Sequence, residues 1–200
     1  MCGTCCGSGL DIFVNTMDVW NLRGCFGAPT GEIIEKYLTI ERRPEFGSYP
    51  ICTIRMPEER CPFMDGTLCG IHPARPAGCR LFPLAQYYDE NGTARFTVFP
   101  ENEFCKGEIS GSSEDITEWL VENDFDSYRM IIEIQKTLRP LSIMNLKQSD
   151  FDRISGILFD FDSADDFCFR GEYPKGKAAA EKAIEWVFRK TEEFMKLIKL

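Results

Sequence analysis

Residues 61–83, CPFMDGTLCGIHPARPAGCRLFP, decide how the first half of this chain folds. Cysteines stand at positions 61, 69 and 79, among four prolines and three glycines. This spacing is too long for the C-x2-C knuckle of a zinc ribbon. Proline fixes the backbone and glycine permits sharp turns. We therefore expect a rigid, irregular loop that holds the three thiols.

Two arginines, Arg75 and Arg80, flank the sulfurs of this loop. A thiolate cage around zinc or an iron–sulfur cluster is anionic, and nearby guanidinium groups offset that charge and donate hydrogen bonds. The alternative is that both arginines pair with surface carboxylates, which contributes little to stability. Because they lie inside the cysteine loop, we favour a cofactor-binding role for both.

A second group of cysteines lies at the N-terminus, as Cys2-x2-Cys5-Cys6. A C-x2-C pair brings two sulfurs to one tetrahedral ion. Neighbouring side chains diverge, so the simplest geometry sends one of the adjacent pair Cys5 and Cys6 to a second centre. Cys105 follows an expected hairpin, and we treat it as a candidate to return to the same site.

The complete pattern resembles a known family. It reads C-x2-C-C, then C-x7-C-x-I-H-x2-R-P-x2-C-R-x-F-P, then C-x-G. This is similar to the YkgJ-type cysteine-cluster family, described as a zinc- or iron-chelating domain, often labelled an iron–sulfur-cluster protein and shared with flagellin lysine N-methylase. The resemblance covers residues 1–110 approximately and is most specific at Cys69–Pro83. It implies that the metal or cluster ligands are Cys2, Cys5, Cys6, Cys61, Cys69, Cys79 and Cys105.

One cysteine of the family pattern is missing. The family usually begins C-x2-C-x2-C-C, so seven matched cysteines stand where eight would make two four-thiolate sites. Three explanations account for the missing cysteine. We rank first that the natural protein begins upstream of this sequence and carries the cysteine there. The other two are a substitute ligand and an open coordination position. The candidate substitutes are Cys25, Cys52 and His72. We expect Cys52 and Cys168 to be core residues and His72 to be packed or hydrogen-bonded rather than ligating, whereas Cys25 lies in a more open loop.

Composition excludes several classes of protein. The chain has 200 residues, a net charge of −9 and 10 cysteines, although a chain of this length needs no staples to fold. Neither half is basic, which argues against nucleic-acid binding. The N-terminus lacks the basic and apolar regions of a signal peptide, and no apolar run could span a membrane. We therefore expect a cytoplasmic protein with no membrane partner and reduced thiols.

The amino-acid composition and the predicted secondary structure of the chain change near residue 110. Nine of the 10 cysteines, nine of the 11 prolines and 11 of the 16 glycines lie in the first 105 residues, and helical patterns dominate afterwards. We predict the α+β class, with a metal-binding domain over 1–110 and a helical region over 111–200 that packs with it or stands apart. The expected helices are 16–23, 31–40, 112–138, 151–159 and 176–199; the expected strands are 49–56, 86–88 and 95–99.

The acidic run Asp160–Asp166 is expected to be a solvated loop, with a cation site as the alternative. Thr30 is expected to cap the helix over 31–40, and Asn15 or Thr16 the helix before it.

All-thiolate ligation suits both zinc and iron–sulfur clusters. Long spacings and a vicinal cysteine pair favour an iron–sulfur cluster, such as 4Fe–4S, with a redox role and an unidentified protein partner. Two other hypotheses remain open: a lysine N-methyltransferase, implied by the resemblance alone, and a structural zinc module that serves as an interaction surface. The sequence leaves open whether the protein is an enzyme.

Overall fold

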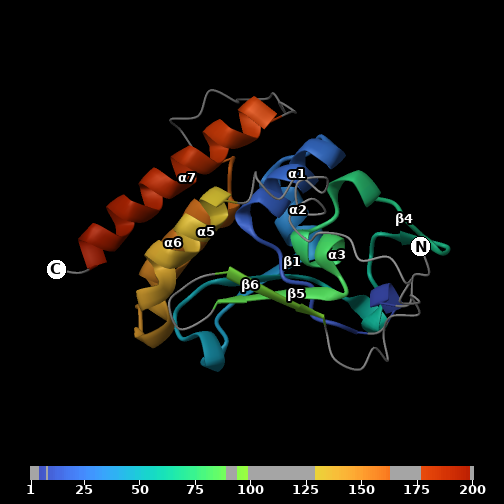
Figure 1. Ribbon diagram of the computed structural model, residues 1–200. Helices are drawn as coiled ribbons and strands as arrows, with labels where there is room; N and C mark the ends of the chain where they lie inside the picture. The colour runs from blue at the N-terminus through green and yellow to red at the C-terminus, as the bar shows by residue number, and fades with distance from the viewer. Residues whose placement is uncertain (1–4, 8, 89–93, 99–128, 163–176, 199–200) are drawn as a thin grey trace.

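The computed structural model describes residues 5–7, 9–88, 94–98, 129–162 and 177–198 (Figure 1). The α-helices are α1 (Thr16–Phe26), α2 (Thr30–Tyr37), α3 (Ala77–Leu81), α5 (Arg129–Leu138), α6 (Gln148–Phe159) and α7 (Lys177–Ile198). The antiparallel strand pairs are β1 (Leu38–Glu41) with β2 (Ile51–Ile54), β3 (Met64–Asp65) with β4 (Leu68–Cys69), and β5 (Leu84–Tyr88) with β6 (Ala94–Val98). Short 3-10 turns are η1 (Cys5–Gly7), η2 (Pro44–Phe46), η3 (Pro57–Glu59), η4 (His72–Ala74) and η6 (Arg139–Ile143). The predicted α+β class is confirmed.

Helix α1 begins where its sequence predicts and ends at a glycine beyond the predicted end. Asn15 is the N-cap, and its side chain accepts a hydrogen bond from the backbone N–H of Asp18 at 3.0 Å, while the Asp18 carboxylate accepts one from the N–H of Asn15. Gly27, with φ of 59°, closes the helix in the left-handed conformation that suits glycine. The helix therefore runs three residues beyond the predicted end at residue 23.

The predicted helix over 31–40 is shorter than expected. It ends at Tyr37, because Leu38 is extended and pairs with Ile54 as the first residue of β1. Leu38 is 1% exposed, so its apolar side chain is satisfied in a strand as well as on a helix face. Thr30 is also not the cap that we predicted. Pro29 holds that position, without a side-chain hydrogen bond.

The later predictions hold where the structure describes them. Helix α7 occupies the predicted segment to within one residue at each end, α6 ends at the predicted residue 159 but begins three residues before the predicted 151, and α5 ends before Pro140. β5 and β6 form the predicted hairpin, in which Gln86 pairs with Phe96. The turn at Asn91-Gly92, the start of the helix predicted from residue 112, and Cys168 lie outside the described residues.

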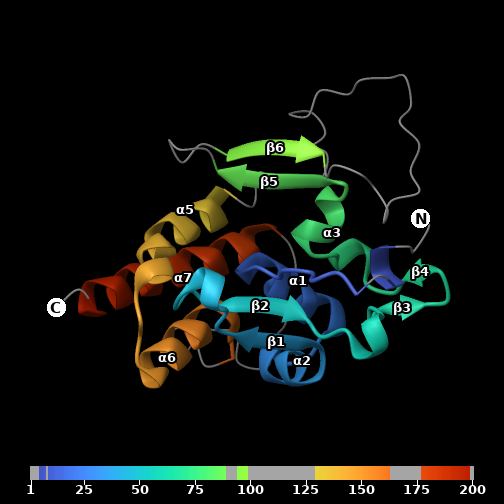
Figure 2. The same ribbon diagram turned by 90° about the horizontal axis from the view of Figure 1, so that it is seen from below.

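A continuous hydrophobic core joins the two halves of the chain. It contains buried side chains from α1 and β2 together with side chains from α5, α6 and α7. In two perpendicular views, η1 lies beside β3 and β4 at one end of the molecule, and α6 lies at the other (Figures 1 and 2). Representative members from the two halves are Val19, Leu22, Ile54, Ile134, Leu138, Ile154, Val187 and Phe194.

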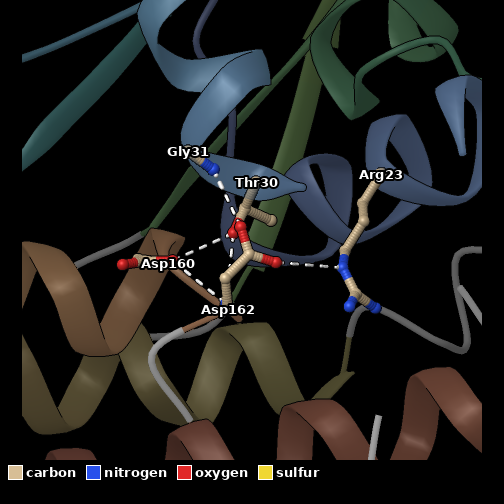
Figure 3. Close-up of polar contacts among 5 residues, drawn as sticks. All are labelled: Arg23, Thr30, Gly31, Asp160 and Asp162. Atoms are coloured by element: carbon tan, nitrogen blue, oxygen red, sulfur yellow. Dashed lines mark hydrogen bonds and ion pairs between the residues drawn. The ribbon is translucent and has the colours of Figure 1, made fainter. Parts of the chain in front are cut away.

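A polar junction also connects the halves, at the N-terminus of α2 (Figure 3). The N–H of Gly31 donates to a carboxylate oxygen of Asp162 at 3.0 Å, and the hydroxyl of Thr30 donates to Asp160 at 3.0 Å. The buried Arg23 places its Nε 3.6 Å from Asp162. The start of the acidic run is therefore a helix cap supplied by a distant segment, and not only a solvated loop as we expected.

Within the described part of the chain, no helix combines the length and the apolar character needed to cross a bilayer.

Candidate metal centre

Two of the predicted ligands lie at a small hairpin: Cys69 ends its second strand, and Cys61 lies three residues before its first. Cys69 pairs with Met64 across β3 and β4, and the N–H of Met64 donates to the carbonyl of Cys61 at 3.2 Å. Gly66, with φ of 59°, allows the tight turn between the strands. Cys61 therefore lies on the segment that leads into the hairpin, and Cys69 is the last residue of its second strand.

Cys6, from the N-terminal group of cysteines, lies against the segment that leads into this hairpin. The backbone N–H of Cys61 donates to the carbonyl of Cys6 at 2.8 Å. A second bond runs from the N–H of Gly9 to the carbonyl of Glu59, at 3.1 Å. Two segments that are distant in the sequence are thus held side by side, and they bring the backbones of Cys6 and Cys61 together, one residue from each of two cysteine groups that the resemblance implies as ligands.

Cys79 lies on a separate element, the short helix α3. The N–H of Ala77, the first residue of α3, donates to the carboxylate of Asp18 at 2.9 Å. Ile71 before the helix and Leu81 at its end are both buried, which fixes the segment on the core. Arg80 follows Cys79 on the same helix and, like Cys79, is partly buried.

The four ligand candidates whose side chains the structure describes share one environment. Each is intermediate between buried and exposed. Such a position lets a thiolate meet a metal that enters from solvent while the fold restricts water around it. These four are Cys6, Cys61, Cys69 and Cys79.

The remaining predicted ligands are Cys2, Cys5 and Cys105. Cys5 is the first residue of η1, but its side chain lies outside the described residues, as do Cys2 and Cys105 entirely. Among the side chains that the structure does describe, no group of three or more Cys, His, Asp or Glu is placed to hold one metal ion. The described thiols thus make up only part of the predicted ligand set.

The three substitute ligands occupy different environments. Cys52 is 2% exposed in β2, and burial, together with the nearby charge of Asp18, raises its pKa to about 12. It is therefore a protonated core residue at neutral pH, as predicted. Cys25 is exposed near the end of α1. His72 is exposed as well, so it is not packed, and its expected non-ligating role stays a prediction.

Arg75 and Arg80 flank Cys79 in the sequence, and both are partly buried. The Nε of Arg75 donates to the backbone carbonyl of His72 at 3.2 Å, which ties the arginine to the turn η4. This bond holds the guanidinium within the cysteine loop. The role of both arginines toward a bound group remains a prediction.

Asp18 is a residue of this region that we did not single out from the sequence. The available signal was the spacing Asn15-x-x-Asp18, which is a variant of the capping box. That pattern indicates the contact within α1, but it carries no information about the contact to Ala77.

The chemistry of the donors fits a thiophilic metal. Thiolates bind zinc, iron and iron–sulfur clusters, and the backbone bond between Cys6 and Cys61 brings two of the implied cysteine groups to one place. The partly buried arginines add positive charge near Cys79. Nothing in the described donor set selects zinc over iron.

Comparison with known proteins yields one match. The model of the family CxxCxxCC, described as "Putative zinc- or iron-chelating domain", matches residues 1–106. Searches of curated proteins and of solved structures find no match. The matched segment contains every cysteine of the predicted ligand set, and the description supports metal binding in general terms.

Proposed function

Because the chain belongs to the CxxCxxCC family of zinc- or iron-chelating domains, we propose that its cysteine cluster holds an iron–sulfur cluster. The observation that carries this proposal is the 2.8 Å bond from the N–H of Cys61 to the carbonyl of Cys6. It supports a single site to which both the N-terminal cysteines and the loop cysteines contribute. Iron and zinc ions are the alternative occupants.

The described residues contribute three things to such a site. Cys6, Cys61 and Cys69 supply sulfur from two adjacent segments, and the short hairpin restricts how far the last two move apart. Cys79 supplies a further thiolate from α3. The partly buried Arg75 and Arg80 lower the energetic cost of gathering negative thiolates. Cys2, Cys5 and Cys105 complete the proposed ligand set.

Iron is favoured over zinc by the arrangement of the ligands. They come from a vicinal pair, a hairpin and a separate helix, with long and irregular spacings. Structural zinc sites usually draw on closely spaced pairs. The chain also has a hydrophobic core of its own, so it has less need of a metal as a structural element. When bound, an iron–sulfur cluster supplies one-electron transfer.

The test is anaerobic expression and purification, followed by analysis of iron, zinc and acid-labile sulfide together with the absorption spectrum. We expect iron and sulfide in comparable amounts and a visible thiolate-to-iron absorption. Cys61→Ser and Cys69→Ser should each lower the iron content and the absorbance. The matched control is Cys52→Ala, which changes a buried core cysteine outside the ligand set and should leave both unchanged.

Stoichiometric zinc without iron or sulfide would reject the iron–sulfur cluster and leave the zinc alternative. Full iron loading in both Cys61→Ser and Cys69→Ser would instead remove these residues from the site.

A further inference from the structure

Two hydrogen bonds that the structure describes for the Asp18 carboxylate belong to different parts of the fold. One carboxylate oxygen, Oδ2, accepts the N–H of Asn15 at 3.0 Å and completes the cap of α1. The other, Oδ1, accepts the N–H of Ala77 at 2.9 Å, from a residue 59 positions away in the sequence. The side chain is fully buried, with 0% exposure.

The second contact explains why a carboxylate is retained in the core. A buried charge is costly unless it receives hydrogen bonds. The cap of α1 uses only one of the two oxygens. Ala77 begins α3, and its preceding residue, Pro76, provides no side-chain hydrogen bond to the helix. Asp18 therefore caps α3 from another element, and its negative charge also suits the positive end of that helix.

Helix α3 depends on such an external contact for its orientation. It has five residues, and an isolated helix of that length is not stable in water. Its own bonds, from the N–H of Arg80 to Pro76 and from the N–H of Phe82 to Gly78, make it one stiff turn. The contact to Asp18 lies at the start of this turn, two positions before Cys79.

We propose that Asp18 is a positioning residue for the Cys79 thiolate. Its hydrogen bond to Ala77 fixes α3 against α1, and this fixes the position of the Cys79 sulfur relative to the metal. The inference rests on the proposed function, because it assumes that Cys79 is a ligand. It concerns a residue outside the cysteine pattern that defines the site.

The test uses Co²⁺ as a probe, titrated anaerobically into metal-free, reduced protein. Cobalt bound by thiolates gives a charge-transfer absorption that grows with the number of sulfur ligands. Asp18→Ala should bind Co²⁺ about 10- to 100-fold more weakly than the wild type. Its absorption per bound cobalt should also fall toward that of Cys79→Ser. A purely structural role would lower thermal stability without changing this spectrum in the folded protein.

Two further variants separate positioning from folding. Asn15→Ala breaks the same α1 cap but leaves the bond from Asp18 to Ala77, so its cobalt affinity and spectrum should match the wild type. Ala77→Pro removes only the donor N–H at the first position of a helix, where proline is well tolerated. It leaves α1 intact and should reproduce the spectrum of Asp18→Ala, even if Asp18→Ala itself folds poorly.

Each outcome bears on one proposal. If Ala77→Pro and any folded Asp18→Ala keep the wild-type affinity and spectrum while Cys79→Ser changes them, the positioning role is overturned and the metal site stands. If the wild type shows no thiolate–cobalt absorption at all, the proposed function itself fails. If Asn15→Ala changes the spectrum as much as Ala77→Pro, the effect belongs to α1 as a whole and the positioning role is rejected.

Discussion

At the scale of single residues, the cysteines divide by environment as well as by sequence pattern. Cys52 is buried and its pKa is raised, whereas Cys6, Cys61, Cys69 and Cys79 are only partly buried. The thiolate, and not the thiol, is the metal ligand. Burial alone therefore separates the core thiol from the ligand candidates, in agreement with the division made from the sequence.

The raised pKa of Cys52 predicts a loss of stability in alkali. The unfolded thiol ionises near its ordinary value of 9.0, whereas the folded thiol keeps its proton until about pH 12. Between these values the folded state binds more protons than the unfolded state. The free energy of unfolding should therefore fall with rising pH, by ~1.4 kcal/mol per pH unit from this group. Below pH 9 the contribution should be constant.

Urea unfolding of metal-free wild type and Cys52→Ala at a series of pH values measures this effect. Other alkaline groups titrate equally in both proteins, so the difference between the two curves isolates Cys52. The wild type should lose more stability than the variant above pH 9. Parallel curves would show that the buried thiol ionises as easily as an exposed one.

Gly47 and Gly27 allow a second prediction at the residue scale. Both have positive φ, of 57° and 59°. A Cβ on Gly27 would meet open space, whereas a Cβ on Gly47 would collide with the backbone carbonyl of Ser142. Gly27→Ala should cost about 1 kcal/mol for its left-handed conformation, and Gly47→Ala about 2–4 kcal/mol, because backbone must also move. Chemical denaturation of both variants tests this order, and equal losses would contradict it.

At the scale of elements, the polar junction at α2 makes a contribution to the free energy of unfolding that can be measured. Asp162 accepts the N–H of Gly31 and faces the buried Arg23. Asp162→Ala removes the cap and the ion partner together, and should lower the free energy of unfolding by about 1–2 kcal/mol. The matched control is Asp152→Ala, an exposed residue of α6. Among the contacts that the structure describes, its carboxylate accepts the local bond from Gln148. That change should cost about 0.5 kcal/mol or less.

Thermal or urea unfolding of the two variants measures the difference. A loss in Asp162→Ala no greater than that in Asp152→Ala would mean that the junction contributes nothing to the fold.

The elements also show how far the sequence determines this structure. Helices with clear caps or an apolar stripe, such as α1, α6 and α7, were predicted nearly to their ends, because their signals are local. The end of α2 was misplaced, since Leu38 joins a strand whose partner, Ile54, lies 16 positions away. Propensity cannot choose between a helix face and a strand when both bury the side chain.

The candidate site likewise combines features that the sequence predicts with contacts that it does not predict. The resemblance implied the cysteine set, and the position of Arg75 and Arg80 inside the cysteine loop favoured a role for them. The family match confirms the resemblance, whereas the ligand set itself stays a prediction. The contact from Asp18 to Ala77 and the cap from Asp162 to Gly31 join distant segments. Such contacts depend on the tertiary arrangement, which no local pattern in one sequence encodes.

At the scale of the whole molecule, the shared core predicts that the two halves unfold together. Phe194, on α7, is 1% exposed and belongs to the same core as Cys52, on β2. Phe194→Ala should destabilise the protein by about 3–5 kcal/mol. Because the core is continuous, Cys52 should become accessible to a thiol reagent in the same transition that melts the helices. The boundary near residue 110 then separates two regions of different amino-acid composition and not two independent folding units.

Alkylation of Cys52 across a urea gradient, followed alongside helical circular dichroism, tests this. Both signals should shift to lower urea by the same amount in Phe194→Ala. If Cys52 keeps its wild-type midpoint while the helical signal shifts, the halves are independent folding units and the shared core does not couple them.

The junction at α2 also sets an order of events during synthesis. Gly31 emerges early, but its cap, Asp162, is 131 positions later. At roughly 5–20 residues per second, the ribosome needs on the order of ten seconds to cover that distance. During this interval the cysteine-rich half is outside the ribosome without its cap and without the C-terminal part of its core. The thiols of the nascent chain are therefore exposed to solvent before the fold that partly buries them is complete.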